Sequence, residues 1–366
     1  MAPNSKLNAK RKEKRDASKP KPSKRNEEKR TEEIIQAPAI PLELQQLLLN
    51  IFRNSFADRL SDDINPLLQE IKGHLYNRDF ATAFGKTEYL EAYAARWSPS
   101  RALGYMDVFW NLKEHLFPAE LGLDDGQGEG RKSWKVVCLG GGAGAEVVAM
   151  GGLQKLLKGA APGEATAHQK SIDVVAIDIA NWTSVVDQIA KHITTAPPLS
   201  KYASAAAKAA NTNLLNEEDI NIRFLQRDVF EVSPTDISTD LATADLVTLM
   251  FTLNELYSAS ISSTQKFLLA LTEIVKPGAL LLVVDSPGSY SSVTLNGTEK
   301  KYPMHWLLDH TLLKQTMTLK ERGQEDIIRW EKVQEDESRW FRLPDTLSYP
   351  IELENMRMQL HLYRRV

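Results

Sequence analysis

A glycine cluster follows an apolar run in the segment KVVCLGGGAGAEVVAM, residues 135–150, and a helix-compatible run follows the glycines. Gly140, Gly142 and Ala145 match the G-x-G-x-x-G/A pattern of a dinucleotide-binding turn. Gly140, Gly142 and Gly144 equally match the G-x-G-x-G pattern of loops that bind S-adenosylmethionine. The loop therefore predicts close approach of a ligand to the backbone, and leaves the choice between these two cofactors open.

Glu146 separates the two cofactors, because it falls in the first turn of the helix expected after the loop. A dinucleotide would place its pyrophosphate there, against the helix dipole, and a carboxylate would repel it. S-adenosylmethionine has no phosphate and carries a sulfonium cation, so Glu146 favours this cofactor. The alternative is that Glu146 only complements the helix dipole at the surface.

Acidic residues close the next two expected strands. Asp178 lies at the end of the second and Asp228 at the end of the third, and ligands of open α/β sheets bind at the carboxyl ends of strands. We expect Asp178 to accept both ribose hydroxyls. Asp228 would accept from the adenine amino group, while the N–H of Val229 reaches a ring nitrogen. Either acid alone would be an ordinary cap or turn residue, but with the loop they predict a site for S-adenosylmethionine.

Alternating strand and helix patterns must position these residues. Five near-continuous apolar runs predict strands covered on both faces; they are 135–141, 173–179, 222–228, 245–251 and 279–286. Helical runs lie between them, and one contains Ser262 and Gln265 at the spacing of a capping box. The pattern predicts an α/β fold with a doubly wound, Rossmann-like sheet over residues 131–366. Helices at 305–316 and a strand at 358–366 would complete it.

The chain before the sheet divides into two parts. Residues 40–130 predict a helical N-terminal region, in which Ser98 and Pro99 would begin the third helix. Residues 1–36 have no aromatic side chain and predict a disordered basic tail. Residues 1–30 hold 12 Lys/Arg against 4 Asp/Glu, a net charge of +8, which leaves −11 for the remainder. Such a tail can attract nucleic acid or serve as a nuclear address.

Composition limits the other possibilities. Cys138 is the single cysteine and the seven histidines are scattered, so we expect no disulfide and no metal site. No apolar segment approaches the length of a membrane helix, and no signal-peptide core follows the basic start. We expect a soluble, unsecreted protein, monomeric by default.

Four segments resemble the fungal 25S ribosomal RNA uridine-N3 methyltransferase family; they are YLEAYAARWSPSRALGY (89–105), VVCLGGGAGAEV (136–147), DLVTLMFTLNELYS (245–258) and LLVVDSPGSY (281–290). The resemblance extends from about residue 42, and residues 131–366 are similar to class I, seven-stranded methyltransferases. It implies a S-adenosylmethionine-dependent enzyme that methylates N3 of a uridine in large-subunit ribosomal RNA. The partner would be ribosomal RNA or a pre-ribosomal particle, and the location the nucleus or nucleolus and the cytoplasm.

The residues also restrict the methylated atom. Methylation of a pyrimidine carbon 5 normally uses a cysteine. Cys138 lies within the first expected strand, where a cysteine is typically a small buried apolar residue, so we do not expect this chemistry. Methylation of a base amino group commonly uses an Asn/Asp-Pro-Pro-aromatic loop, and FTLNELYS (251–258) lacks both prolines. Methylation of a weakly acidic ring N–H such as uridine N3 is compatible with these residues. It needs only a proton acceptor and a substrate oriented toward the methyl group.

Three polar residues follow the fourth and fifth strands and are the catalytic candidates. We expect Glu255 to act as base or orienter, Asn254 to bond the uracil edge, and Asp285 to be the alternative base. Helix capping is the alternative for Asn254 and Glu255, and a turn is the alternative for Asp285. Three aromatic residues could stack on the base: Phe251, Tyr257 and Tyr290.

Arg96 and Arg101 could hold the methionine carboxylate of the cofactor or an RNA phosphate, or could lie on a solvated surface. Of the two, we expect Arg96 to contact the cofactor. Because the body is acidic, the tail, a local basic patch or a protein partner would have to supply RNA contacts. Three other functions stay open: a methyltransferase of proteins or small molecules, a ribosome-assembly factor without activity, and a dehydrogenase.

Overall fold

The computed structural model describes residues 40–61, 63–118, 133–159, 171–197, 199, 201–205, 211–231, 236–288, 290–295, 298–315 and 328–366. The predicted tail (1–36) and the break expected at 122–130 lie outside the described residues. Leu42–Val366 forms one compact unit. Within it, helices from the N-terminal region pack directly against helices of the sheet domain.

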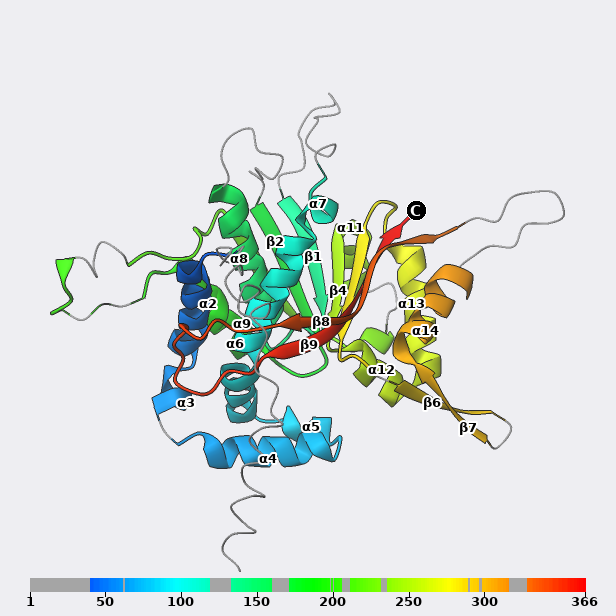
Figure 1. The fold of residues 1–366 in the computed structure, drawn as a ribbon, viewed down its shortest axis with the longest axis horizontal. Helices are drawn as coiled ribbons and strands as arrows, with labels where there is room; N and C mark the ends of the chain where they lie inside the picture. The colour runs from blue at the N-terminus through cyan, green and yellow to red at the C-terminus, as the bar shows by residue number, and fades with distance from the viewer. Residues whose placement is uncertain are drawn as a thin grey trace, which may run out of the picture. The chain divides into compact units, whose positions relative to one another are not determined.

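A seven-stranded sheet forms the centre of this unit (Figure 1). Its strands are β1 (Ser133–Leu139), β2 (Ser171–Asp178), β3 (Ile220–Gln226), β4 (Leu246–Met250), β5 (Leu280–Asp285), β8 (Trp330–Phe341) and β9 (Met356–Arg365). The order is β3-β2-β1-β4-β5-β9-β8. Strands β1 to β5 are parallel, whereas β9 runs antiparallel to both of its neighbours. The predicted doubly wound α/β sheet is confirmed.

Two strands differ from the prediction. Strand β3 is not covered on both faces, because it lies at the edge of the sheet and most of its side chains are half-buried or exposed. Strand β8 was not predicted at all. Its sequence WEKVQEDESRWF is too polar to resemble a buried strand, and it forms the opposite edge.

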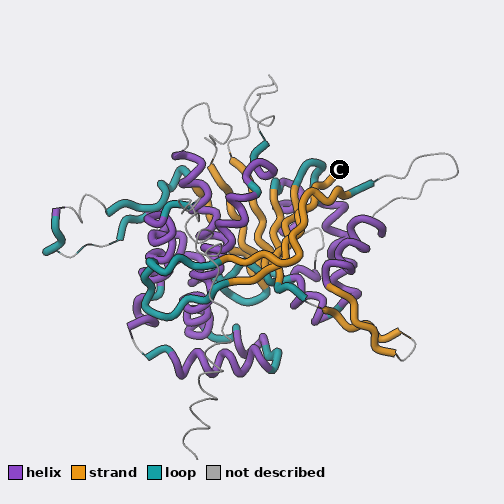
Figure 2. The backbone as a smooth tube through the Cα atoms, viewed as in Figure 1, coloured by secondary structure: helices purple, strands orange, loops and turns teal. Residues whose placement is uncertain are grey.

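Helices cover both faces of the sheet (Figure 2). On one side lie α2 (Leu42–Ser55), α6 (Thr87–Asn111), α8 (Ala145–Gly159) and α9 (Thr183–Thr194). On the other lie α11 (Asp236–Thr243), α12 (Leu253–Ala259), α13 (Ile261–Ile274), α14 (Met304–Asp309) and the π-helix η5 (His310–Gln315). Val137 and Leu281 of the sheet share a buried cluster with Leu268 of α13. The remaining elements are α3 (Ala57–Ser61), α4 (Asn65–Tyr76), α5 (Phe80–Ala83), α7 (Lys113–Leu116), the 3-10 turn η4 (Val229–Glu231) and a hairpin of β6 (Tyr290–Leu295) and β7 (Thr298–Pro303).

Helix α13 begins differently from the sequence prediction. Ser260 is its N-cap residue, and the Ser260 hydroxyl accepts the N–H of Ser263 at 3.1 Å. The predicted box of Ser262 and Gln265 is therefore wrong, because the helix has already begun at Ile261. Ser260 satisfies one of the first free N–H groups of the helix, as a capping serine does.

Helix α6 continues through Pro99, although Ser98 and Pro99 were expected to begin a new helix. Proline has no N–H, so the carbonyl of Ala95, four residues earlier, loses its helical donor. The hydroxyl of Tyr349, in the connection between β8 and β9, donates to this carbonyl at 2.8 Å. A donor far away in the sequence thus replaces the missing bond and keeps α6 continuous.

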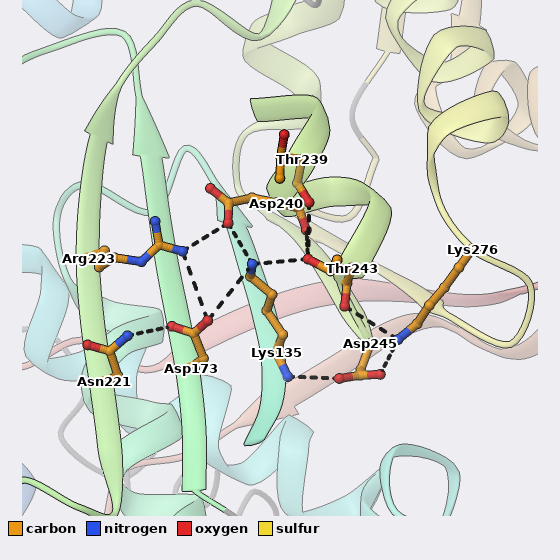
Figure 3. Close-up of polar contacts among 9 residues, drawn as sticks. All are labelled: Lys135, Asp173, Asn221, Arg223, Thr239, Asp240, Thr243, Asp245 and Lys276. Carbon is orange, nitrogen blue, oxygen red and sulfur yellow. Dashed lines mark hydrogen bonds and ion pairs between the residues drawn. The ribbon is translucent and has the colours of Figure 1, made fainter. Parts of the chain in front are cut away.

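The amino ends of the strands are joined by an ion-pair network (Figure 3). Asp240 of α11 pairs with Lys135 of β1 at 2.6 Å and with Arg223 of β3 at 2.9 Å. Burial alone would raise the pKa of Asp240, but the hydrogen bonds from Lys135 and Arg223 outweigh it and lower the pKa. Asp245 accepts the N–H of Lys135 and pairs with Lys276, just before β5. These contacts tie together the end of the sheet opposite the predicted site.

Replacing Tyr349 tests the contact across Pro99. Tyr349→Phe leaves the buried carbonyl of Ala95 without its donor, which should lower the free energy of unfolding by about 1–3 kcal/mol. Urea denaturation measures this. In a Pro99→Ala background the alanine N–H restores a donor, so the same Tyr349→Phe change should cost clearly less. Equal costs in both backgrounds would show that Tyr349 acts through packing alone.

Candidate functional site

The glycine loop leaves β1 at the carboxyl end of the sheet. Gly140 and Gly144 both adopt a φ of +78°, the left-handed region that favours glycine. The N–H of Gly140 donates to the carbonyl of Ile177 at 2.8 Å, which fastens the loop to β2. The hydroxyl of Ser98 on α6 donates to the carbonyl of Ala143 at 2.7 Å. A Cβ on Gly142 would lie 2.1 Å from the Trp182 ring, so only glycine fits there.

Glu146 lies beneath this loop and not on the surface. Its residue is 3% exposed, and its carboxyl group accepts a hydrogen bond from the Thr248 hydroxyl at 2.6 Å. Burial raises the pKa of Glu146 to about 8. The group is therefore mainly the neutral acid at pH 7, and the prediction that its negative charge repels a pyrophosphate is wrong. The alternative of an exposed dipole partner is equally wrong; Glu146 supports the loop from below.

Asp178 ends β2 directly beside the loop. Its two carboxylate oxygens accept the N–H of Gly142 at 3.3 Å and that of Ala180 at 3.1 Å. Burial raises the pKa of Asp178 to about 6, although these N–H groups favour the ionised form. Asp178 is thus still charged at neutral pH, at the position where the sequence predicted ribose recognition.

Asp228 follows β3 at the same end of the sheet. Its carboxylate accepts the N–H of Phe230 at 2.8 Å, and Val229 begins the 3-10 turn η4. This is the contact of a turn residue, the alternative given for an isolated acid. The structure therefore brings the glycine loop, Asp178 and Asp228 to one edge, in the order that the strand ends dictate.

The segment after β4 begins with a strained residue. Phe251 has a φ of 59°, which is rare for a bulky side chain and costs free energy. Its N–H donates to the carbonyl of Val284 at 2.7 Å, which holds the end of β4 against β5. Strain of this kind persists where surrounding structure enforces it, and it is frequent at functional sites.

Asp285, at the end of β5, organises the start of α12. Its two oxygens accept the N–H of Asn254 at 3.0 Å and the N–H of Ser286 at 2.7 Å. The residue is 2% exposed, and burial raises the pKa of Asp285 to about 6 against the effect of these donors. Asp285 therefore caps α12 and shapes its own turn. Thr252, the N-cap residue of α12, makes no side-chain cap bond, and the Asp285 carboxylate supplies the cap instead.

Glu255 lies in the first turn of α12 and is reached by solvent. Protein packed around its carboxyl group nevertheless raises the pKa of Glu255 to about 7 by desolvation, against the opposing effect of Arg101. An accessible carboxyl group with a pKa near neutrality is suited to proton transfer.

Arg101 of α6 is the cation that acts on Glu255. Its guanidinium group donates to the Tyr93 hydroxyl at 2.7 Å and lies 5.4 Å from the centre of the Phe251 ring. Arg96 instead forms an ion pair with Glu354 in the β8–β9 connection. The expected contact of Arg96 with the cofactor stays a prediction, and Arg101 is the arginine whose charge acts on Glu255. Tyr93 and Arg101 are eight residues apart on one continuous helix, a spacing that indicates a shared face once the helix is known to pass Pro99.

Of the predicted stacking residues, Phe251 follows β4 beside Arg101, and its side chain is half-buried. Tyr257 is 2% exposed and belongs to the core between the sheet and α13, so its predicted role in stacking is wrong. The side chain of Tyr290 lies outside the described residues. Within the described ranges, His, Cys, Asp and Glu form no group of three that could hold a metal ion. No described helix is long and apolar enough to cross a membrane.

The strand order, the reversed strand β9, and the glycine loop with an acid at the end of β2 define a class I, S-adenosylmethionine-dependent methyltransferase. Comparison with known proteins agrees: the family described as "Putative SAM-dependent methyltransferase" matches residues 52–364. The chain belongs to this family. The predicted cofactor, S-adenosylmethionine, is thereby confirmed.

A curated relative from Saccharomyces cerevisiae, "25S rRNA (uridine(2843)-N(3))-methyltransferase", is 33% identical over 336 residues, which cover 87% of this chain and 85% of the relative. Among solved structures, a methyltransferase from Methanosarcina mazei aligns with a TM-score of 0.33 and 10% identity, over 65% of this chain and 94% of its own. One from Leishmania major aligns with a TM-score of 0.34 and 9% identity, over 71% and 76%. Scores this low carry no argument about function.

Gly142→Ala tests the loop. The new Cβ would overlap the Trp182 ring and displace the N–H that faces Asp178, so we expect the Kd for S-adenosylmethionine to rise by roughly tenfold or more. Isothermal titration calorimetry measures it. Gly159→Ala is the matched control, because nothing lies within 4 Å of a Cβ at that position. Unchanged affinity in the Gly142 variant would place the cofactor away from this loop.

Proposed function

We propose that this protein methylates N3 of a uridine in large-subunit ribosomal RNA with S-adenosylmethionine. The observation that carries the proposal is the similarity to the yeast enzyme, which extends over 87% of the chain and includes the site. The substrate would be ribosomal RNA or a pre-ribosomal particle, and the location would be the nucleus or nucleolus and the cytoplasm.

The cofactor would lie at the carboxyl edge of β1, β2 and β3. The loop of Gly140, Gly142 and Gly144, whose first and last glycines adopt positive φ, would run alongside the cofactor, and Asp178 would accept its ribose hydroxyls. Asp228 and Val229 would contact the adenine. S-adenosylmethionine supplies an electrophilic methyl group bound to a sulfonium. Because Arg96 is paired with Glu354, we assign the methionine end of the site to the α6 face that carries Arg101.

The chemistry of uridine N3 requires removal of a weakly acidic proton. We propose that Glu255 accepts this proton, since it is accessible and its pKa of about 7 matches a base that works near neutral pH. When N3 loses its proton, negative charge spreads to the two carbonyl oxygens of uracil. Arg101, whose charge already acts on Glu255, would balance that charge.

The other two candidates take supporting positions in this proposal. Both oxygens of Asp285 accept backbone N–H groups, so Asp285 would position α12 instead of acting as base. The side chain of Asn254 stays available for the uracil edge. Because N3 lies on the Watson–Crick edge, the target uridine must be unpaired or flipped out of a helix.

Glu255→Gln tests the base. We expect kcat for methylation of an RNA substrate to fall by about 10²–10⁴ while the Kd for S-adenosylmethionine is unchanged. In the wild type the rate should rise with pH through about 7 and then level off, because Glu255 acts when deprotonated. The variant should lack this rise.

Glu218→Gln provides the control, since Glu218 is exposed and precedes β3 at the other end of the sheet. If Glu255→Gln keeps both the rate and the pH profile, the base lies elsewhere, and Asp285 becomes the next candidate.

A further inference from the structure

The strands β8 and β9 continue beyond the rest of the sheet (Figure 1). β5 pairs with β9 only as far as Asp285 opposite Gln359. From there Met356–Met358 of β9 pairs with β8 alone, with Trp340 opposite Arg357. We call the part formed by residues 339–342 and 356–358 the overhang. It begins beside Asp285, and the Gln359 side chain donates to the carbonyl of Ser286 at 2.8 Å. The overhang therefore extends from the edge that carries the proposed catalytic residues.

One face of the overhang packs on α6. Met356 is buried, and a Cβ on Gly104 of α6 would collide with Met356 and would contact Phe341 at 3.3 Å. On the same face Arg339 pairs with Asp107 of α6 at 2.6 Å. These contacts fix the overhang against the helix that carries Arg101.

The opposite face of the overhang is open. Side chains alternate between the faces of a strand, so Trp340 and Arg357 point away from α6. Trp340 is 53% exposed, and Arg342 and Arg357 are exposed as well. The two guanidinium groups lie 5.3 Å and 5.8 Å from the centre of the Trp340 ring, within cation–π distance.

The described residues place no carboxylate in an ion pair with the two arginines of this face. Arg357 donates through Nε and Nη2 to the hydroxyl of Ser338, at 3.0 Å and 2.8 Å, which is an uncharged partner. In the part of the chain that the structure describes, neither Arg342 nor Arg357 forms an ion pair. Both arginines thus present positive charge on a protein in which residues 31–366 carry a net charge of −11.

Trp306 offers a useful contrast, since it is 46% exposed on α14. It stacks on Tyr302 at 5.2 Å and on His310 at 5.4 Å, with both pairs of rings nearly parallel. Its ring is therefore engaged by its own chain. No ring of the described residues stacks on Trp340, whose neighbours are the two cations.

We propose that the open face of the overhang binds an unpaired segment of the substrate RNA adjacent to the methylated base. A base would stack on Trp340, and Arg342 and Arg357 would contact phosphates on either side of it. The proposal rests on the proposed function, because it assumes an RNA substrate. It gives an acidic protein a local site for the phosphate backbone, and it places that site next to the carboxyl edge where the uridine must enter.

The test measures RNA binding separately from methyl transfer. The full chain is titrated with fluorescently labelled, single-stranded oligouridine RNA, and anisotropy is recorded at several salt concentrations. Trp340→Ala should weaken binding by roughly tenfold or more, whereas Trp340→Phe keeps a ring and should retain most of the affinity. Replacing both Arg342 and Arg357 by glutamine should reduce the magnitude of the slope of log K against log salt by about 1.4, since each phosphate contact on a single strand contributes about 0.7.

Trp306→Ala is the matched control and should leave binding unchanged. The Kd for S-adenosylmethionine, measured in every variant, shows that each remains folded. If Trp340→Ala binds oligouridine as well as the wild type while the wild type methylates RNA, this inference is overturned and the proposed function stands. If the wild type neither binds nor methylates RNA, both are overturned.

Discussion

Helix α6 must pass Pro99 without a break, and the hydrogen bond from Tyr349 to the carbonyl of Ala95 makes this possible. The C-terminal half of the helix then reaches three parts of the molecule. Ser98 supports the glycine loop, Arg101 acts on Glu255, and Gly104 receives the overhang. A helix that ended at Ser98 could not align these contacts. Tyr349 belongs to the β8–β9 connection. The last strands of the chain therefore support the helix that contacts the glycine loop.

Burial gives the acids of the site different charges at neutral pH. Glu146 has a pKa of about 8 and is mainly neutral beneath the loop, where it bonds to Thr248. Asp178 and Asp285, with pKa values of about 6, remain ionised because backbone N–H groups stabilise their charge. Glu255 has a pKa between these values, at about 7, and is the most exposed of the four. Carboxyl groups at one edge of the sheet therefore support the loop and accept backbone N–H groups, and the proposed base is a further member of the same set.

The sequence predicts what local patterns encode. Apolar runs identified the five parallel strands. The glycine spacing predicted that the loop and Asp178 lie at one edge, and the structure brings them together there because strand ends of a parallel sheet meet on one side. Features that depend on distant contacts were missed or misread. Pro99 locally indicates a helix start, and its replacement donor lies 250 residues further on. The burial of Glu146 depends on Thr248 of another strand. The polar strand β8 lies at an edge of the sheet, where its polar side chains stay exposed or half-buried, and the ion pair of Arg96 joins it to Glu354, far away in the sequence.

The central claim is that the protein places a methyl group on N3 of a uridine in large-subunit ribosomal RNA. Mass spectrometry of nucleosides from that RNA tests it most directly, in cells that lack the protein and in the same cells after it is supplied again. The account predicts that N3-methyluridine decreases when the protein is absent and returns when it is restored. An unchanged amount of N3-methyluridine would contradict the account, and would leave a methyltransferase whose substrate is a different molecule.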